Sequence, residues 1–144
     1  MISKRLPNKV FIDIYKKVPR LCVDLVIKNK GNVLLSKREI LPRKGQWHLP
    51  GGTVLLHETL KLTARRVAKE ETGLDIKIGK TLGFIEFFSD TAPFHALSVV
   101  LEVFPKGGKL RGSYQGRKLV FLKKFPVPII REHRAFLKEN KLIK

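Results

Sequence analysis

Residues 52–74 read GTVLLHETLKLTARRVAKEETGL, and this stretch decides the fold and the chemistry that the chain predicts. It begins in the turn Pro50-Gly51-Gly52, and Gly73 stands where a glycine would end a helix. The helix expected over residues 59–72 carries an arginine and two adjacent glutamates. A glycine turn followed by a helix with this polar face indicates a ligand site.

Glu70 and Glu71 are the two adjacent carboxylates, and in isolation they repel each other. Each helical residue advances about 100°, so positions 67, 70 and 71 are expected on one face. A hard cation between two carboxylates removes the repulsion, and Mg²⁺ binds through one or two carboxylates plus substrate phosphates. The pair therefore predicts a metal site that a phosphorylated ligand completes, with the Gly52 carbonyl as a further ligand.

Arg66 lies four residues before Glu70, so the two side chains are expected to brace each other on the helix surface. The competing interpretation is an ordinary amphipathic helix whose Glu and Lys residues face water. The residues at fixed offsets around the pair, which are the glycine turn, Glu58, Arg66 and Gly73, favour the site.

Length and composition predict one domain over residues 1–144. The chain is 43% apolar, as ordinary globular proteins are, and no apolar run reaches the roughly 20 residues that cross a bilayer. The start, MISKRLPN, lacks the apolar stretch of a secretory signal. Cys22 is the single cysteine, which excludes an internal disulfide, so we expect a cytoplasmic protein without membrane partners and Cys22 as a core residue.

The charge is strongly basic and lies at the two ends of the chain. Thirty Lys and Arg residues against 12 Asp and Glu residues give a net charge of +18. Residues 42–103 hold 8 basic and 7 acidic residues, whereas residues 1–41 hold 10 and 3, and residues 104–144 hold 12 and 2. Such a field attracts polyanions such as nucleotides, RNA or anionic lipid, so weak nonspecific polyanion binding is expected.

The order of expected elements favours a layered α/β fold. Strand patterns are expected over 21–27, 33–37, 47–49, 76–88, 94–104 and 118–122, with helices over 8–17, 59–72 and 128–141 and a loop over 105–116. In the first strand, Leu21, Val23, Leu25 and Ile27 alternate with Cys22, Asp24 and Val26. A mixed sheet with helices on both faces is the simplest arrangement of these elements.

The opening stretch resembles the Nudix box. That pattern is Gly, five residues, Glu, seven residues, Arg-Glu, an aliphatic residue, any residue, Glu-Glu, any residue, Gly and an aliphatic residue. The chain matches it at Gly52, Glu58, Arg66, Ala68, Glu70, Glu71, Gly73 and Leu74, and departs from it at Val67, where a glutamate is expected. The resemblance implies a Nudix-like α/β/α sandwich with a mixed sheet and a hydrolase that acts on a nucleoside diphosphate linked to another moiety.

The same resemblance implies the roles of the box residues. Glu70 and Glu71 become ligands of Mg²⁺, or of Mn²⁺, together with the Gly52 carbonyl. Arg66 and Glu58 become the pair that orients the helix and its acidic face. Val67 takes no such role, because an isopropyl group neither accepts a proton nor binds a cation.

A looser similarity to the GDP-mannose mannosyl hydrolase branch suggests a nucleotide sugar as substrate. In that branch the position of Val67 is not acidic, and water attacks the sugar carbon. By this likeness Asp24 holds the sugar or the nucleotide, Arg38 grips the diphosphate with its planar fork, and the protein forms a homodimer. The similar stretches are residues 18–25, 34–38, 45–52 and 57–60.

The general base stays unassigned. The branch uses a histidine on a late loop, but the corresponding loop here has Tyr114 and Gln115 and no histidine. Side chains that would substitute if the fold brings them near the metal are His95, His133, Glu86 and, ranked above Glu86, Glu102. His48 and His57 flank the glycine turn and are expected in packing or surface roles.

Two alternatives to a nucleotide-sugar hydrolase remain open at this point. A nucleotide-binding module with weakened catalysis would keep Glu70, Glu71 and the glycine turn. A Nudix enzyme that acts on RNA 5′ ends would use the basic ends of the chain, although aromatic pairs suited to base stacking are not interleaved with the basic residues. The sequence leaves open the sugar and the atom that water attacks.

Overall fold

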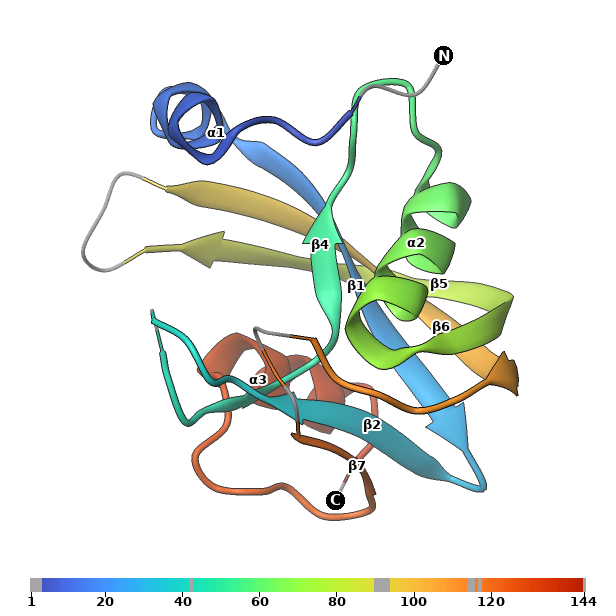
Figure 1. Cartoon of the computed structure of the whole chain (residues 1–144). Coiled ribbons are helices and arrows are strands. Elements are labelled where there is room, and N and C mark those ends of the chain that lie inside the picture. Colours follow the sequence, from blue (N-terminus) through green and yellow to red (C-terminus); the bar gives the residue numbers. More distant parts are fainter. Residues whose placement is uncertain (1–3, 42, 90–93, 114–115, 117, 144) are drawn as a thin grey trace.

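The structure is a computed structural model that describes residues 4–41, 43–89, 94–113, 116 and 118–143. Within these ranges three helices and seven strands follow one another along the chain (Figure 1). Their bounds are α1 Asn8–Tyr15, β1 Arg20–Asn29, β2 Asn32–Lys37, β3 Trp47–His48, β4 Gly51–Thr53, α2 Leu60–Thr72, β5 Leu74–Phe88, β6 His95–Gly108, β7 Lys118–Leu122 and α3 Arg131–Glu139.

The strands form one mixed sheet with the order β3-β2-β1-β6-β5, while β4 pairs with β1 and β7 pairs with β2. The pairing of β1 with β6 is parallel, and the other strand pairings are antiparallel. Strand β1 is therefore central, which explains why its residues from Cys22 to Ile27 are buried on both faces.

Helices α2 and α3 cover opposite faces of this sheet (Figure 1). The alternation predicted for β1 is confirmed, because Val23, Leu25 and Ile27 pack on the α2 side and Val26 packs on the α3 side. The α2 cluster also includes Ala64, Val67, Ala68, Leu101 and Val103, and the α3 cluster includes Ile85, Val100, Phe136 and Leu137. The predicted α/β class with a mixed sheet between helices is thus confirmed.

The ends of α2 have local causes. The Thr59 hydroxyl accepts a hydrogen bond from the Leu62 backbone N–H (3.1 Å), which satisfies one of the free donors of the first turn. At the other end Gly73 takes φ 77°, and a Cβ there would lie 2.2 Å from the Lys109 carbonyl oxygen. Any residue but glycine would clash at this C-cap, so the predicted helix ends where it was expected.

Several expected boundaries were wrong. Strand β6 continues to Gly108 where a loop was expected from residue 105, because its backbone pairs with β5 as far as Leu74. Helix α3 starts at Arg131 rather than at residue 128, because Ile129 bridges to Trp47 and the Ile130 N–H donates to the Trp47 carbonyl. Strand β1 continues to Asn29 rather than ending at residue 27, because Lys28 and Asn29 pair with β2. Across the described ranges, no helix has the length and apolar character needed to span a membrane.

Candidate active site

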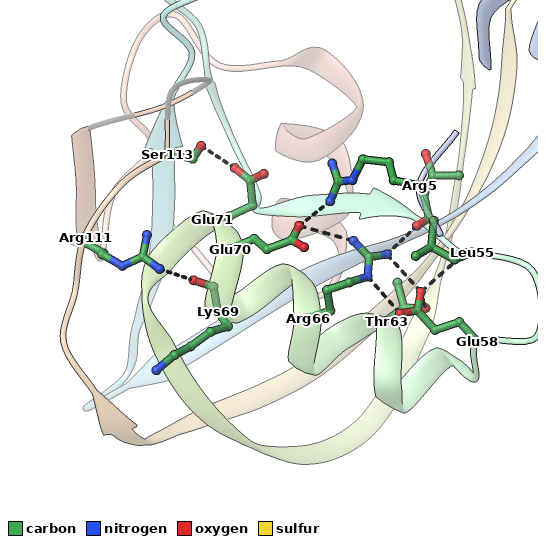
Figure 2. Close-up of polar contacts among 11 residues, drawn as sticks. Arg5, Leu55, Glu58, Thr63, Arg66, Lys69, Glu70, Glu71, Arg111 and Ser113 are labelled. Carbon is green, nitrogen blue, oxygen red and sulfur yellow. Dashed lines mark hydrogen bonds and ion pairs between the residues drawn. The ribbon is translucent and has the colours of Figure 1, made fainter. Parts of the chain in front are cut away.

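Gly51 and Gly52, expected in a turn, belong instead to strand β4, which pairs with β1 and lies directly against α2. A Cβ added to Gly52 would come within 2.9 Å of Val67 Cγ2, so a glycine is required for this close approach. The Arg66 Nη2 donates to the Thr53 carbonyl (2.8 Å) and ties β4 to the helix a second time. The polar residues of the predicted site therefore surround one junction between β4 and α2 (Figure 2).

Glu58 lies at the amino-terminal side of this junction and is fully engaged. Its carboxylate accepts hydrogen bonds from the Leu55 N–H (3.1 Å), the Thr63 hydroxyl (2.7 Å) and Arg66 Nε and Nη2 (2.8 and 2.9 Å). Its side chain is 3% exposed. Hydrogen bonds from Arg66 lower the pKa of Glu58 to about 2, with Thr63 and Leu55 acting in the same direction.

Arg66 connects the two ends of the acidic face. Its guanidinium forks onto Glu58 and also reaches Glu70 Oε2 through Nη1 (3.3 Å). The carboxylate of Glu58 raises the pKa of Arg66 above its ordinary value. The structure thus brings together the three residues that the sequence placed in one cluster, and the planar fork of Arg66 sets their geometry.

Glu70 and Glu71 differ in surroundings although they are neighbours. Glu70 has a side chain 42% exposed and contacts both Arg5 and Arg66 through Oε2. Glu71 is half-buried and accepts a hydrogen bond from the Ser113 hydroxyl (2.9 Å). Burial raises the pKa of Glu71, and the charge of Glu70 raises it further, whereas Ser113, Arg5 and Arg38 oppose the shift. Adding positive charge here would relieve a carboxylate pair that the protein compensates only in part.

The helix geometry predicted Val67 on the same face as these carboxylates, but in the structure it does not lie beside them at the surface. It is 1% exposed and packs with Ala64 and Ala68 in the core under α2. Gly52 of β4 lies over Val67, whereas Glu70 and Glu71 stay at the edge of α2, where they form what we call its acidic rim. Residue 67 thus contributes apolar packing where the box pattern has a carboxylate.

Arg38 lies close to the acidic rim. Its positive charge lowers the pKa of Glu71 and also that of His48. Its backbone is fixed by hydrogen bonds with Gln46 and Gly45 (2.8 and 2.7 Å). It lines a surface depression together with Lys37, Glu39, Lys44, Gly45 and Lys118. Four of these residues are basic, and one of them, Arg38, acts electrostatically on Glu71, which suits an anionic ligand.

Asp24 is buried on the α3 side of β1. Its Oδ2 lies 3.3 Å from His133 Nε2, and His133 Nδ1 accepts from the Leu49 N–H (3.1 Å). The Leu49 contact fixes the ring proton on Nε2, so His133 donates to Asp24 and has no ring nitrogen ready to act as a base. A Cβ on Gly51 would meet Asp24 Oδ1, so this carboxylate also packs against the glycine turn.

His48 lies beside this pair, with a pKa that burial lowers to about 4. Its Nδ1 contacts the Leu49 carbonyl (2.8 Å), and its ring centroid is 6.4 Å from that of His133. It is therefore neutral at physiological pH and serves the packing role expected from the sequence. His57 is exposed and lies in the turn before α2 with φ 68°.

The other candidate bases point elsewhere. Glu102 pairs with Lys28 (3.4 Å), and Val100, two residues before it on the same side of β6, packs in the cluster under α3 rather than under α2. The ranking of Glu102 as a carboxylate facing the site was therefore wrong, because α2 covers the opposite face of β6. Glu86 contacts His95 (3.5 Å) on the β5–β6 hairpin. Tyr114 and Gln115 lie outside the described residues.

The residues at the rim fit a divalent cation. Two adjacent carboxylates, one with a raised pKa, and a glycine turn offer oxygen ligands of the kind that Mg²⁺ and Mn²⁺ prefer. Among the described residues, no group of three His, Cys, Asp or Glu side chains is arranged to hold a metal. A cation here would complete its coordination with water and substrate oxygens, which is the usual arrangement for Mg²⁺.

Sequence reasoning missed two residues of the site, Arg5 and Ser113. Arg5 is 65 positions from its partner Glu70, and Ser113 is 42 positions from Glu71. Neither belongs to the glycine–helix pattern. The only sequence signal that concerned Arg5 was the excess of basic residues in the first part of the chain, and that excess does not indicate Glu70 as its partner. No pattern in the sequence points to Ser113.

Comparison with known proteins gives consistent results. The family model of the NUDIX domain matches residues 18–135. The chain is 43% identical over 107 residues to the low-salt glycan biosynthesis protein Agl8 of Haloferax volcanii, covering 70% of this chain and 69% of that protein. It is 31% identical over 140 residues to an ADP-ribose pyrophosphatase of Methanocaldococcus jannaschii, covering 95% and 83%.

A solved structure, the MutT NUDIX hydrolase of Burkholderia pseudomallei, superposes with a TM-score of 0.78 at 25% identity, covering 85% of this chain and 98% of that one. The family model spans most of the chain, and the archaeal pyrophosphatase relative extends over nearly all of it. The glycine turn, the Arg66–Glu58 pair and the two rim carboxylates occupy the junction on which the box pattern depends. The chain therefore belongs to the Nudix hydrolase family.

Proposed function

We propose that this hydrolase cleaves a nucleoside diphosphate linked to a sugar, with Mg²⁺ or Mn²⁺ held by Glu70, Glu71 and the Gly52 carbonyl. The observation that carries the proposal is the rim of α2. Glu71 has a raised pKa beside Glu70, and Arg38 lies close enough to act on it. A carboxylate pair whose repulsion the protein compensates only in part, with the positive charge of Arg38 acting on it, suits a metal–diphosphate complex.

Each residue of the junction has a separate task in this proposal. Arg66 and Glu58 hold the helix against β4, so that the carboxylates stay in place when the ligand binds. Ser113 orients Glu71 by its hydrogen bond. Arg38 binds the diphosphate of the substrate. The bound cation supplies charge neutralisation of the diphosphate oxygens.

A nucleotide sugar such as GDP-mannose is the first candidate substrate. The relative with the higher identity is named for glycan biosynthesis, and the similarity to GDP-mannose mannosyl hydrolases points in the same direction. Val67 supports this choice, because its burial leaves the rim without the third carboxylate of the box pattern. Asp24 would contact the sugar or nucleotide only if the ligand reaches past the glycine turn, against which its carboxylate packs.

ADP-ribose is the second candidate. It is also a nucleoside diphosphate attached to a sugar, and the relative that covers 95% of the chain is named an ADP-ribose pyrophosphatase. The two candidates differ in the base and in the second sugar, so they make different products. They share the diphosphate, which is the part that the rim of α2 would bind.

A substrate screen tests the proposal. GDP-mannose, other nucleotide sugars, ADP-ribose, dinucleotide polyphosphates, nucleoside triphosphates and 5′-triphosphorylated RNA are incubated with Mg²⁺ or Mn²⁺, and products are identified by mass. We expect turnover of a nucleoside diphosphate sugar. Reaction in ¹⁸O-labelled water shows whether the label enters the sugar or the phosphate, and so which atom is attacked.

Glu71→Gln and Glu86→Gln form a matched pair for this screen. Both changes remove one carboxylate, but Glu86 lies on the β5–β6 hairpin beside His95. Loss of turnover is expected in Glu71→Gln alone. Intact metal-dependent turnover in Glu71→Gln would show that the site is misplaced.

A further inference from the structure

Arg5 reaches the acidic rim from the N-terminal segment. Its Nη2 lies 2.5 Å from Glu70 Oε2, and Figure 2 shows its guanidinium above the carboxylate, on the side away from the helix axis. Residues 4–7 precede α1 outside any helix or strand. The contact therefore joins a segment without regular secondary structure to a proposed metal ligand.

The two arginines on Glu70 are held differently. Arg66 is 21% exposed and is fixed by Glu58 and Thr53 as well as by Glu70. Arg5 is 64% exposed, and an exposed ion pair contributes little net stability. Arg66 is thus a permanent part of the junction, whereas Arg5 can leave Glu70 at low cost.

Arg5 and a divalent cation compete for the same negative charge. The guanidinium of Arg5 contacts Glu70 Oε2, an oxygen of a carboxylate that the proposed metal would use. A dication on these oxygens repels a guanidinium a few ångströms away. A metal-bound diphosphate restores negative charge beside that position, and the planar fork of arginine matches phosphate oxygens.

We propose that Arg5 is a diphosphate-binding residue that rests on Glu70 and moves to the substrate when the metal binds. The inference deepens the proposed function and rests on it for the position of the metal. It makes the N-terminal segment a part of the active site. Arg5 then has two measurable effects of opposite sign, since it weakens metal binding and strengthens binding of the diphosphate.

Calorimetry with Mn²⁺ alone tests the first effect. Arg5→Ala is expected to bind Mn²⁺ about threefold more tightly than the unchanged protein, because a competing cation is gone. Lys4→Ala is the matched control, since it removes one positive charge from the adjacent residue. Equal Mn²⁺ affinity in Arg5→Ala and Lys4→Ala would overturn the proposal.

Calorimetry with ADP at saturating Mn²⁺ tests the second effect. ADP presents the diphosphate without requiring turnover. Arg5→Ala is expected to bind ADP about tenfold more weakly, with Arg5→Lys in between because an ammonium lacks the fork. Tighter Mn²⁺ binding together with unchanged ADP affinity would also overturn the proposal, because Arg5 would then only block the metal.

These outcomes are separable from failure of the proposed function. If the unchanged protein takes up no Mn²⁺ with or without ADP, both the metal site and the role of Arg5 are wrong. If it binds Mn²⁺ and ADP with the expected effects of Arg5→Ala but hydrolyses no nucleotide sugar, the substrate assignment alone fails.

Discussion

At the start of α2, Glu58 accepts four hydrogen bonds, two of them from one guanidinium, whereas near its end Glu71 is half-buried beside the like charge of Glu70. The pKa of Glu58 falls to about 2, while that of Glu71 rises. Both are carboxylates of the same box. The charge of Glu58 is therefore neutralised by groups of the protein itself, whereas Glu71 would be stabilised by a cation that the protein does not supply.

The largest expected effect separates the two carboxylates by activity. Glu71→Gln should lower kcat/KM on the order of 100- to 1,000-fold, because a proposed metal ligand loses its charge. Its stability should not fall. A carboxyl with a raised folded pKa destabilises the fold above that pKa, so the variant should match the unchanged protein at low pH and exceed it at neutral pH.

Denaturant unfolding across pH, together with steady-state rates, measures both quantities. Comparable losses of stability in Glu71→Gln and Glu58→Gln at neutral pH would contradict the inference that only Glu58 stabilises the fold.

Glu58→Gln should show the opposite pattern in stability. A pKa lowered from 4.5 to about 2 corresponds to about 3 kcal/mol of folding free energy at neutral pH. Because the folded pKa is depressed, this stability is present above pH 4.5 and is lost as the pH falls toward 2. The difference in unfolding free energy between the variant and the unchanged protein should therefore be largest at pH 7 and should shrink below pH 4.5. Urea unfolding at several pH values measures it.

Val67→Glu adds a third carboxylate to α2 at the position where the box pattern has a glutamate. Val67 is 1% exposed, so an ionised group there should cost roughly 3 kcal/mol of stability. If the new carboxylate reaches the rim, Mn²⁺ should restore more stability to this variant than to the unchanged protein. Val67→Gln is the control of equal size without charge, and its thermal midpoint should gain no more from Mn²⁺ than that of the unchanged protein.

The smallest expected effect concerns the hydrogen bond from Ser113 to Glu71 (2.9 Å). Ser113→Ala should weaken Mn²⁺ affinity about tenfold, since residues that orient a ligand contribute in this range. Ser113→Thr keeps the hydroxyl and should retain most of the affinity. If both variants bind Mn²⁺ equally well, the orientation of Glu71 does not depend on this contact.

The fold was largely predictable because its signals are local or periodic. The alternation in residues 21–27 separated the two faces of β1, and Thr59 and Gly73 marked the ends of α2. The boundaries that failed depend on partners distant in sequence. Ile129 fits the helical pattern but forms a β-bridge with Trp47. Strand β6 extends beyond its sequence pattern because its backbone pairs with β5.

By itself the sequence determined the glycine–helix–glycine segment and the cluster of Glu58, Arg66, Glu70 and Glu71. Helical spacing makes Arg66 and Glu70 neighbours and sets Glu71 next to Glu70, and Glu58 stands just before the N-cap of the same helix. Tertiary structure alone decided that Val67 is core, that Asp24 meets His133, and that Arg5 and Ser113 reach the two rim carboxylates. Those contacts join residues 42 to 109 positions apart, so they exist only once the sheet has brought its ends together.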